Sequence, residues 1–282
     1  MSRVESGYLA STPRLYYRVW HPLQQAKGVV LIVHGLGGHG GQFVPPAEMW
    51  SSADLAVYTV DLRGHGRSDG RRGYINRWQE YLQDLNQIFQ EGRRDYERVP
   101  LFLWGHSLGG LIALDYVLKY PESLAGLMLS APAVGQTEVS PILFTLGRLL
   151  SWIWPHFSLN LGFDPDACSR IPEVTKRYNR DPIRHTRGTA RLSTEFQKAQ
   201  ARVMNAVSTI VTPTLLLHGG GDRITNPKDS LKLYKAMTTS NCRLIEYPEA
   251  YHELHLDLNQ AQVMDDMSQW IYTRICGANK GR

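Results

Sequence analysis

The segment Gly105-His106-Ser107-Leu108-Gly109 has the residue types and spacing of a nucleophile on a tight turn. It follows an apolar run typical of a buried strand, and a helical pattern extends from Leu108 to Tyr120. A serine between two glycines at such a junction lies on a strained turn that lifts its hydroxyl above the end of the strand. The N–H of Leu108 then lies at a helix N-terminus, where partial positive charge collects. We therefore predict that Ser107 is a nucleophile and that Leu108 supplies one donor of an oxyanion hole.

A serine nucleophile needs a histidine base and a carboxylate that orients the base. Asp222 follows the predicted strand Thr214–Leu217, and His252 follows the predicted strand Arg243–Tyr247. Both residues therefore belong to the carboxyl edge of the sheet, in the chain order serine, acid, histidine. A second oxyanion donor is expected from the loop after the third strand, where the N–H of Leu36 is the candidate.

Four other polar residues near these positions have weaker claims to a catalytic role. His255 is the nearest alternative base, although its place in the loop is less favourable. Asp229 lies within a helical pattern and Asp257 lies beyond the loop, so each is a weaker candidate for the acid. His218 lies within a predicted strand, and we interpret it as a core or supporting histidine.

Length and composition indicate a globular protein of one large domain, or of one domain with an inserted cap. The chain has 282 residues, of which 43% are hydrophobic, and its net charge is +5. The basic residues are scattered without interleaved aromatic residues, which argues against a nucleic-acid partner. The three cysteines form no C-x-x-C pair, which argues against a disulfide framework or a structural zinc site. The N-terminus shows no secretory signal, so we expect a cytoplasmic location.

Apolar runs and helical patterns alternate along most of the chain. The predicted strands are Val4–Ala10, Leu15–Trp20, Val29–Val33, Ala56–Val60, Leu101–Trp104, Leu124–Leu129, Thr214–Leu217 and Arg243–Tyr247. The first two flank a turn over 11–14 and predict a hairpin. Residues with helical spacing occur between Trp78 and Phe89 and between Val263 and Ile271. This alternation predicts an α/β fold with a mostly parallel, doubly wound sheet.

The alternation breaks between about Gly135 and Val211, where we find helical or irregular patterns and no convincing strand. We interpret residues 135–211 as a helical cap or lid over the site, and residues 1–134 and 212–282 as the core.

The apolar part of this predicted cap, residues 141–157, is our candidate for contact with substrate. Phe144, Trp152 and Trp154 are the predicted substrate-binding residues, and part of the same surface is expected to touch a membrane. A membrane span is a poorer interpretation, because Gly147 and Pro155 interrupt a segment that is barely long enough.

Several of these segments together resemble the α/β-hydrolase superfamily, and within it the monoacylglycerol lipase and lysophospholipase group of serine hydrolases. The matching segments are His34-Gly35-Leu36-Gly37, Asp61-Leu62-Arg63-Gly64-His65-Gly66-Arg67-Ser68, Gly105-His106-Ser107-Leu108-Gly109, Asn179-Arg180-Asp181-Pro182, Gly221-Asp222 and Tyr251-His252-Glu253. The resemblance implies an α/β-hydrolase fold, a Ser107–Asp222–His252 triad and an oxyanion hole at Leu36 and Leu108. It also implies that the enzyme uses no cofactor and no metal.

We therefore expect a serine carboxylic ester hydrolase that acts on monoacylglycerols or related single-chain lipids through an acyl-enzyme. Lysophospholipase and general carboxylesterase activities are the alternatives within this class. A catalytically silent receptor on the same fold is a further alternative, although an intact triad argues against it.

An NAD-dependent oxidoreductase is the alternative from a different class of enzyme. Residues 35–40 form a literal G-x-G-x-x-G after a strand, and Asp61 follows near the spacing of a dinucleotide site. Pro45 and Pro46 argue against it, because a phosphate-binding helix would have to run through them.

Two further patterns begin at His252. The segment His252–His255 is one residue short of a zinc-protease signature. The segment His252–Asp257 fits a loose H-x-x-x-x-D pattern of acyltransferases, which is short and common by chance.

Overall fold

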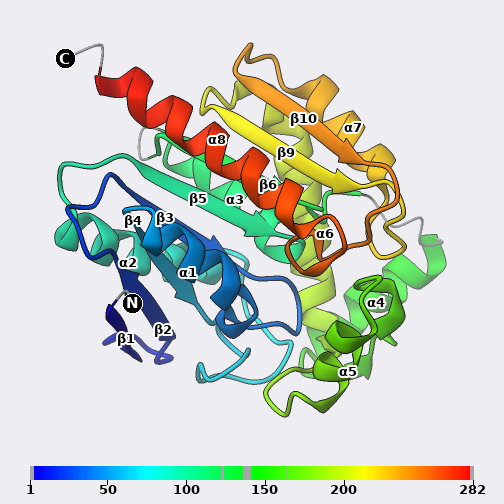
Figure 1. The fold of residues 1–282 in the computed structure, drawn as a ribbon. Coiled ribbons are helices and arrows are strands. Elements are labelled where there is room, and N and C mark those ends of the chain that lie inside the picture. The colour runs from blue at the N-terminus through cyan, green and yellow to red at the C-terminus, as the bar shows by residue number, and fades with distance from the viewer. Residues whose placement is uncertain (1–2, 122–123, 136–140, 163, 280–282) are drawn as a thin grey trace.

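The computed structural model describes residues 3–121, 124–135, 141–162 and 164–279. Among these residues, eight strands form one sheet in the order β1-β2-β4-β3-β5-β6-β9-β10 (Figure 1). β2 pairs antiparallel with β1 and β4, and the later pairs are parallel. The strands are β1 (Arg3–Tyr8), β2 (Tyr16–His21), β3 (Gly28–Val33), β4 (Leu55–Val60), β5 (Leu101–His106), β6 (Gly126–Ser130), β9 (Thr214–Gly219) and β10 (Cys242–Tyr247). The predicted hairpin and the mostly parallel sheet are confirmed.

Helices cover both faces of this sheet. Figure 1 shows α1 and α8 on the face toward the viewer, while α2, α3 and α7 lie behind the sheet. The helices outside the cap are α1 (Val44–Ser52), α2 (Gln79–Asp95), α3 (Leu108–Lys119), α7 (Pro227–Ala236) and α8 (Gln260–Asn279). The two predicted helical patterns are confirmed as α2 and α8. α2 begins one residue after Trp78 and extends past Phe89, and α8 extends beyond its pattern at both ends.

The central strands are continuous apolar runs because both of their faces are buried. In β3, Val29, Leu31 and Val33 join the hydrophobic core that includes α2 and α3. Val30 and Ile32, which point to the opposite face, join the core that includes α1 and α8. Two cores therefore hold the sheet, and the loops at its carboxyl edge start from fixed positions.

A helical cap lies between β6 and β9 in the sequence. It contains α4 (Pro141–Ile153), α5 (Pro172–Arg180) and α6 (Ala190–Ala206), and α6 packs against both α3 and α4. The cap also contains a small antiparallel pair, β7 (Ser158–Asn160) with β8 (Arg187–Thr189). The expectation of no strand in this segment was therefore wrong. Strands of three residues are too short to show an alternating apolar pattern.

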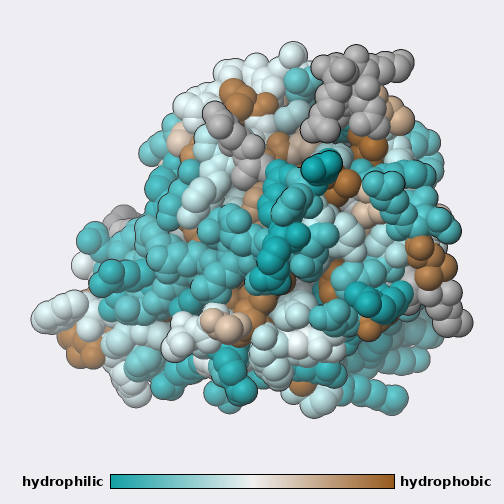
Figure 2. Space-filling view, turned by 90° about the vertical axis from the view of Figure 1, so that its left-hand side faces the viewer, coloured by the Kyte–Doolittle hydropathy of each residue, from teal (hydrophilic) through white to brown (hydrophobic). Residues whose placement is uncertain are grey.

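Exposed apolar residues are scattered on one side of the described structure and are concentrated on α4. Figure 2 shows the side on which β1 and α2 lie, where apolar residues occur in small groups among hydrophilic ones. On α4, by contrast, Leu146, Leu149, Trp152 and Ile153 are all exposed within two turns of one helix. None of the helices described here has the length and hydrophobicity needed to cross a membrane.

Two glycines allow α3 to approach the sheet unusually closely. A Cβ atom on Gly109 would lie 2.2 Å from the carbonyl oxygen of Val33 in β3. A Cβ atom on Gly105 would lie 2.4 Å from the carbonyl oxygen of Gly109. Both contacts are with backbone atoms, which have no rotamer by which to move away. Only glycine therefore fits at either end of the turn that carries Ser107.

Gly109→Ala should consequently destabilise the protein by about 3 kcal/mol or more, because the added methyl group overpacks a main-chain contact. Gly147→Ala is the matched control, since nothing lies within 4 Å of its added Cβ in α4. That change should leave stability equal or raise it by up to about 1 kcal/mol, since alanine favours helix over glycine. Urea unfolding midpoints measure both effects, and equal midpoints for the two variants would contradict the packing described here.

Candidate active site

Ser107 occupies a strained backbone position at the junction of β5 and α3. Its φ is 54°, in the left-handed region that side chains other than glycine avoid. Backbone hydrogen bonds hold it there. The Ser107 N–H donates to Ser130 at 3.0 Å, while its carbonyl accepts from Gly110 at 2.9 Å and from Ala133 at 3.0 Å. Such strain persists where surrounding structure over-determines it, which is typical of functional sites.

His252 and Asp222 lie together at the carboxyl edge of the sheet. His252 Nδ1 is 2.8 Å from Asp222 Oδ2, and both side chains are buried. Because a carboxylate only accepts hydrogen bonds, the Nδ1 atom must carry the proton. The other nitrogen, Nε2, is then free of a proton in the neutral ring and is the atom that can accept one.

The Asp222 carboxylate receives several further hydrogen bonds from its own loop. The N–H groups of Ile224 and Thr225 donate to Oδ1 at 2.7 and 3.0 Å, and the Thr225 hydroxyl donates to Oδ2 at 2.8 Å. His218 Nε2 lies 3.2 Å from the same Oδ2. Burial alone would raise the pKa of Asp222, but the charge of His252 and the hydrogen bonds from His218 and His252 outweigh it. The pKa of Asp222 is therefore held below its usual range, so that it remains ionised.

The loop after β3 lies directly against Ser107. A Cβ atom on Gly35 would lie 3.0 Å from the Ser107 Cβ atom. Gly37, with a φ of 73°, accepts a hydrogen bond from the N–H of His185 in the cap at 3.1 Å. Within the described ranges, neither the Leu36 N–H nor the Leu108 N–H donates a hydrogen bond. Both residues also line the cavity beside Ser107.

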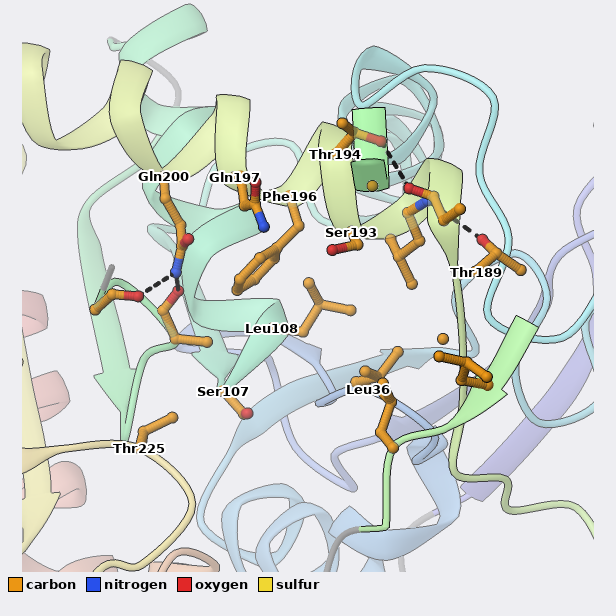
Figure 3. A pocket seen from close by; sticks show the side chains of 18 of the residues that line it. Leu36, Ser107, Leu108, Thr189, Ser193, Thr194, Phe196, Gln197, Gln200 and Thr225 are labelled. Atoms are coloured by element: carbon orange, nitrogen blue, oxygen red, sulfur yellow. Dashed lines mark hydrogen bonds between the residues drawn. The ribbon is translucent and has the colours of Figure 1, made fainter. Parts of the chain in front are cut away.

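A cavity of about 700 Å³ lies between the cap and the sheet and opens onto Ser107. Figure 3 shows Ser107, Leu36 and Leu108 at its base, with Phe196 and Ser193 of α6 across from them. Its walls include apolar side chains from α4, β7 and α6 and from the connections on either side of β7, namely Leu150, Phe157, Leu159, Leu161, Leu192 and Phe196. Its size and mostly apolar walls are typical of a small-molecule site.

Of the three predicted substrate-binding residues, the two tryptophans do not line this cavity. Trp152 is 77% exposed and Trp154 is 57% exposed, and neither side chain lines the cavity. Both lie on the outer surface of the cap, because α4 turns Gly147 and Leu150 inward instead. The side chain of Phe144 lies outside the described part of the structure.

The alternative acids and the alternative base have other contacts. The Asp257 carboxylate accepts hydrogen bonds from the N–H groups of Arg170 and Tyr251, each at 2.8 Å. Asp229 pairs with Lys232 on α7. His255 is fully buried and stacks on Phe43, with ring centroids 4.4 Å apart. Burial lowers the pKa of His255 to about 3, so this ring is neutral and packed into the core.

The structure also gives the G-x-G-x-x-G segment a role other than dinucleotide binding. The carboxylate of Asp61 is buried and accepts hydrogen bonds from the N–H groups of Gly40 at 2.7 Å and Arg67 at 2.8 Å. Asp61 therefore joins two loops inside the protein, and its oxygens are not presented to a ribose.

Comparison with known proteins identifies the family. A family model described as serine aminopeptidase, S33, matches residues 24–259. The chain belongs to this family of α/β-hydrolases. It is a serine hydrolase, and the resemblance drawn from the sequence is confirmed.

Several relatives match most of this chain. A monoacylglycerol lipase of Mycolicibacterium smegmatis is 31% identical over 264 residues, 93% of this chain and 94% of the relative. The human monoglyceride lipase is 30% identical over 269 residues, which cover 94% and 88% of the two chains. The crystal structure of Paleococcus ferrophilus monoacylglycerol lipase superposes with a TM-score of 0.84 at 31% identity, covering 92% and 99%.

Two residues of the site were missed by the sequence analysis. Thr225 donates to the acid, and Gln200 donates from α6 to the carbonyl groups of Ala133 and Gly135, beside the turn of Ser107 (Figure 3). An aspartate followed three residues later by threonine was a local signal for the first contact. No local signal exists for the second, because it joins distant parts of the chain.

Thr225→Val should lower kcat about tenfold, because the buried Asp222 loses one hydrogen bond to a charged group while shape is conserved. Steady-state kinetics on a soluble ester measure the effect. Thr273→Val on the exposed face of α8 is the control and should match the wild type. Unchanged kcat in a folded Thr225→Val variant would show that this contact does not support the acid.

Proposed function

We propose that Ser107, His252 and Asp222 are the catalytic triad of a carboxylic ester hydrolase. Ser107 attacks the ester carbonyl while His252 Nε2 takes the hydroxyl proton. Asp222 orients the imidazole through Nδ1 and stabilises its charged form. The hydrogen bond between His252 and Asp222 supports their roles as base and acid, and the strained position of Ser107 supports its role as nucleophile.

The Leu36 and Leu108 N–H groups hold the oxyanion of the tetrahedral intermediate. As the intermediate collapses, His252 returns the proton to the alcohol oxygen, the alcohol leaves, and the acyl group stays on Ser107. Water then attacks the acyl-enzyme by the same steps, with His252 again as the base. The described structure has no hydrogen bond from Ser107 to His252, and in free enzymes such contacts often form only with substrate.

The proposed substrate is a monoacylglycerol or a related single-chain lipid ester. The apolar cavity that opens onto Ser107 carries this proposal, since it can surround one acyl chain. Each buried methylene contributes about 0.8 kcal/mol, so a chain in the cavity binds more strongly as it lengthens. The lipase names of the relatives support the same substrate class. Activity on a panel of monoacylglycerols, lysophospholipids and short p-nitrophenyl esters distinguishes this class from lysophospholipase and general esterase activity.

Residues 135–211 are proposed as the cap and residues 1–134 and 212–282 as the core. Cap elements form most of the cavity wall, while the triad and both oxyanion donors come from the core. The core would then carry out the reaction, and the cap would select the acyl chain of the substrate.

The outer face of α4, together with Trp154 directly after it, is proposed to contact the lipid surface from which substrate is drawn. Trp152, Ile153 and Trp154 are more than half exposed, and two exposed leucines extend the same surface. Tryptophan at the interface of a bilayer places an apolar ring among lipid chains at the headgroup level.

Ser107→Ala should abolish labelling by a fluorophosphonate and lower turnover by about three orders of magnitude or more. His252→Ala should be nearly as damaging, because the triad fails as a unit. His255→Gln should keep activity within about fivefold, since His255 is a core residue. Labelling and ester turnover measure all three, and a greater loss in the His255 variant than in the His252 variant would overturn the assignment of the base.

Trp152→Asp should reduce activity on dispersed long-chain monoacylglycerol more than on a soluble acetate ester, because a charged side chain opposes insertion into lipid. The measurement is the ratio of kcat/KM for the two substrates, compared with wild type. Leu23→Asp, which changes another exposed apolar residue in the connection between β2 and β3 of the core, is the control. An unchanged ratio in folded Trp152→Asp would remove the lipid-contact proposal.

A further inference from the structure

A buried pair of opposite charges flanks the proposed nucleophile and base. His106 directly precedes Ser107, and Glu253 directly follows His252. Their side chains are 2% and 9% exposed, and His106 Nε2 lies 3.2 Å from Glu253 Oε2. Neither residue belongs to the triad or to the cavity wall.

The surroundings of His106 favour a charged ring. Its Nδ1 atom is 3.1 Å from both the carbonyl and the hydroxyl oxygen of Ser130, and its Nε2 atom faces the Glu253 carboxylate at ion-pair distance. The carbonyl and the carboxylate can only accept, so the imidazolium, with a proton on each nitrogen, matches both. Burial alone would lower the pKa of His106, but the charge of Glu253 raises it above its ordinary value. Burial would likewise raise the pKa of Glu253, but His106 holds it well below its usual range.

Three of the titratable groups around Glu253 stay neutral. On its own loop, His255 lies 3.8 Å away and has its pKa lowered by burial to about 3. From the cap, burial raises the pKa of the Cys168 thiol to about 12, and it raises that of the Tyr178 hydroxyl well above its usual value. Asp222 is the other carboxylate that acts on His106. Glu253 is therefore the direct counter-charge of His106.

The ion pair of His106 with Glu253 joins two parts of the site that follow strands not adjacent in the sheet. Ser107 follows β5, whereas His252 follows β10, and β6 and β9 lie between these strands. Asp222 follows β9, the strand beside β10. Its hydrogen bond therefore fixes His252 only relative to the loop after β9. The contact between His106 and Glu253 instead reaches from the last residue of β5 to the histidine loop. The two rings of His106 and His252 also lie 4.8 Å apart.

We propose that the ion pair of His106 with Glu253 sets the position of His252 relative to Ser107, so that both are positioning residues for the reaction. This inference rests on the proposed function, in which Ser107 and His252 are nucleophile and base. A displacement of about 1 Å between reacting groups costs roughly a hundredfold in rate. A buried pair that loses one partner leaves an uncompensated charge, so the link depends on both residues.

Glu253→Gln tests the pair with little change of shape. It should lower kcat about 10- to 100-fold with KM within about twofold, and to the same extent for an acetate ester and a long-chain monoacylglycerol. Glu249→Gln is the matched control, because Glu249 lies in the same loop with its side chain 89% exposed. The control should change kcat less than about twofold. Wild-type kcat in a folded Glu253→Gln variant would overturn the positioning role.

Nitrogen-15 NMR of labelled histidine in the wild-type protein tests the pair without any requirement for activity. The His106 signals, assigned by their loss in His106→Asn, should show two protonated nitrogens at pH 7.5, and Glu253→Gln should convert them to one. A neutral His106 in the wild type would overturn the ion pair, even if Glu253→Gln failed to fold. Wild-type protein that neither hydrolyses esters nor takes the fluorophosphonate label would instead refute the proposed function, whatever the NMR result.

Discussion

The contact between α3 and the sheet at Gly105 and Gly109 determines where every other part of the site must lie. Glycine at both positions allows the helix to start within van der Waals contact of the β3 backbone. The chain therefore turns so sharply at Ser107 that its φ becomes positive. The same turn brings the Leu108 N–H to a helix N-terminus beside the serine. The Leu36 loop and the cap cavity are then arranged around a hydroxyl whose position is fixed.

Buried charge is the second constraint, and each buried carboxylate of the site is surrounded by donors or by a counter-charge. Asp222 receives hydrogen bonds from two backbone N–H groups, a hydroxyl and a histidine. Glu253 instead faces the imidazole ring of His106 at ion-pair distance. A carboxylate buried without such partners would take up a proton, because burial disfavours the ionised form. The loops after β9 and β10 are thereby held in the arrangement that the proposed chemistry requires.

The parts of the fold that could be predicted are those with a local signal. Continuous apolar runs identified β3 and its neighbours, and three–four spacing identified α2. The glycine–serine–glycine turn and the chain order identified Ser107, Asp222 and His252 as residues that meet at one edge of the sheet. The roles assigned to these three residues stay predictions until variants are measured.

The remaining features depend on contacts between distant residues. The pair of β7 with β8 has three residues in each strand, too few for a pattern. Helix α4 is apolar on nearly all of its faces. Its hydrophobic periodicity therefore does not distinguish the exposed face with Trp152 from the cavity-lining face with Leu150. The pairing of His106 with Glu253 has no local signal either, because a charged residue beside a catalytic motif usually indicates a solvated loop.

The central claim is that ester hydrolysis proceeds through an acyl group on Ser107. The most direct measurement is mass spectrometry of the protein quenched with acid during turnover of p-nitrophenyl butyrate, followed by peptide mapping of the modified site. The account predicts a butyryl adduct on the peptide that contains Ser107, which disappears once substrate is exhausted. An adduct on a different residue would contradict the account. So would the absence of any adduct under conditions where release of p-nitrophenol shows a burst.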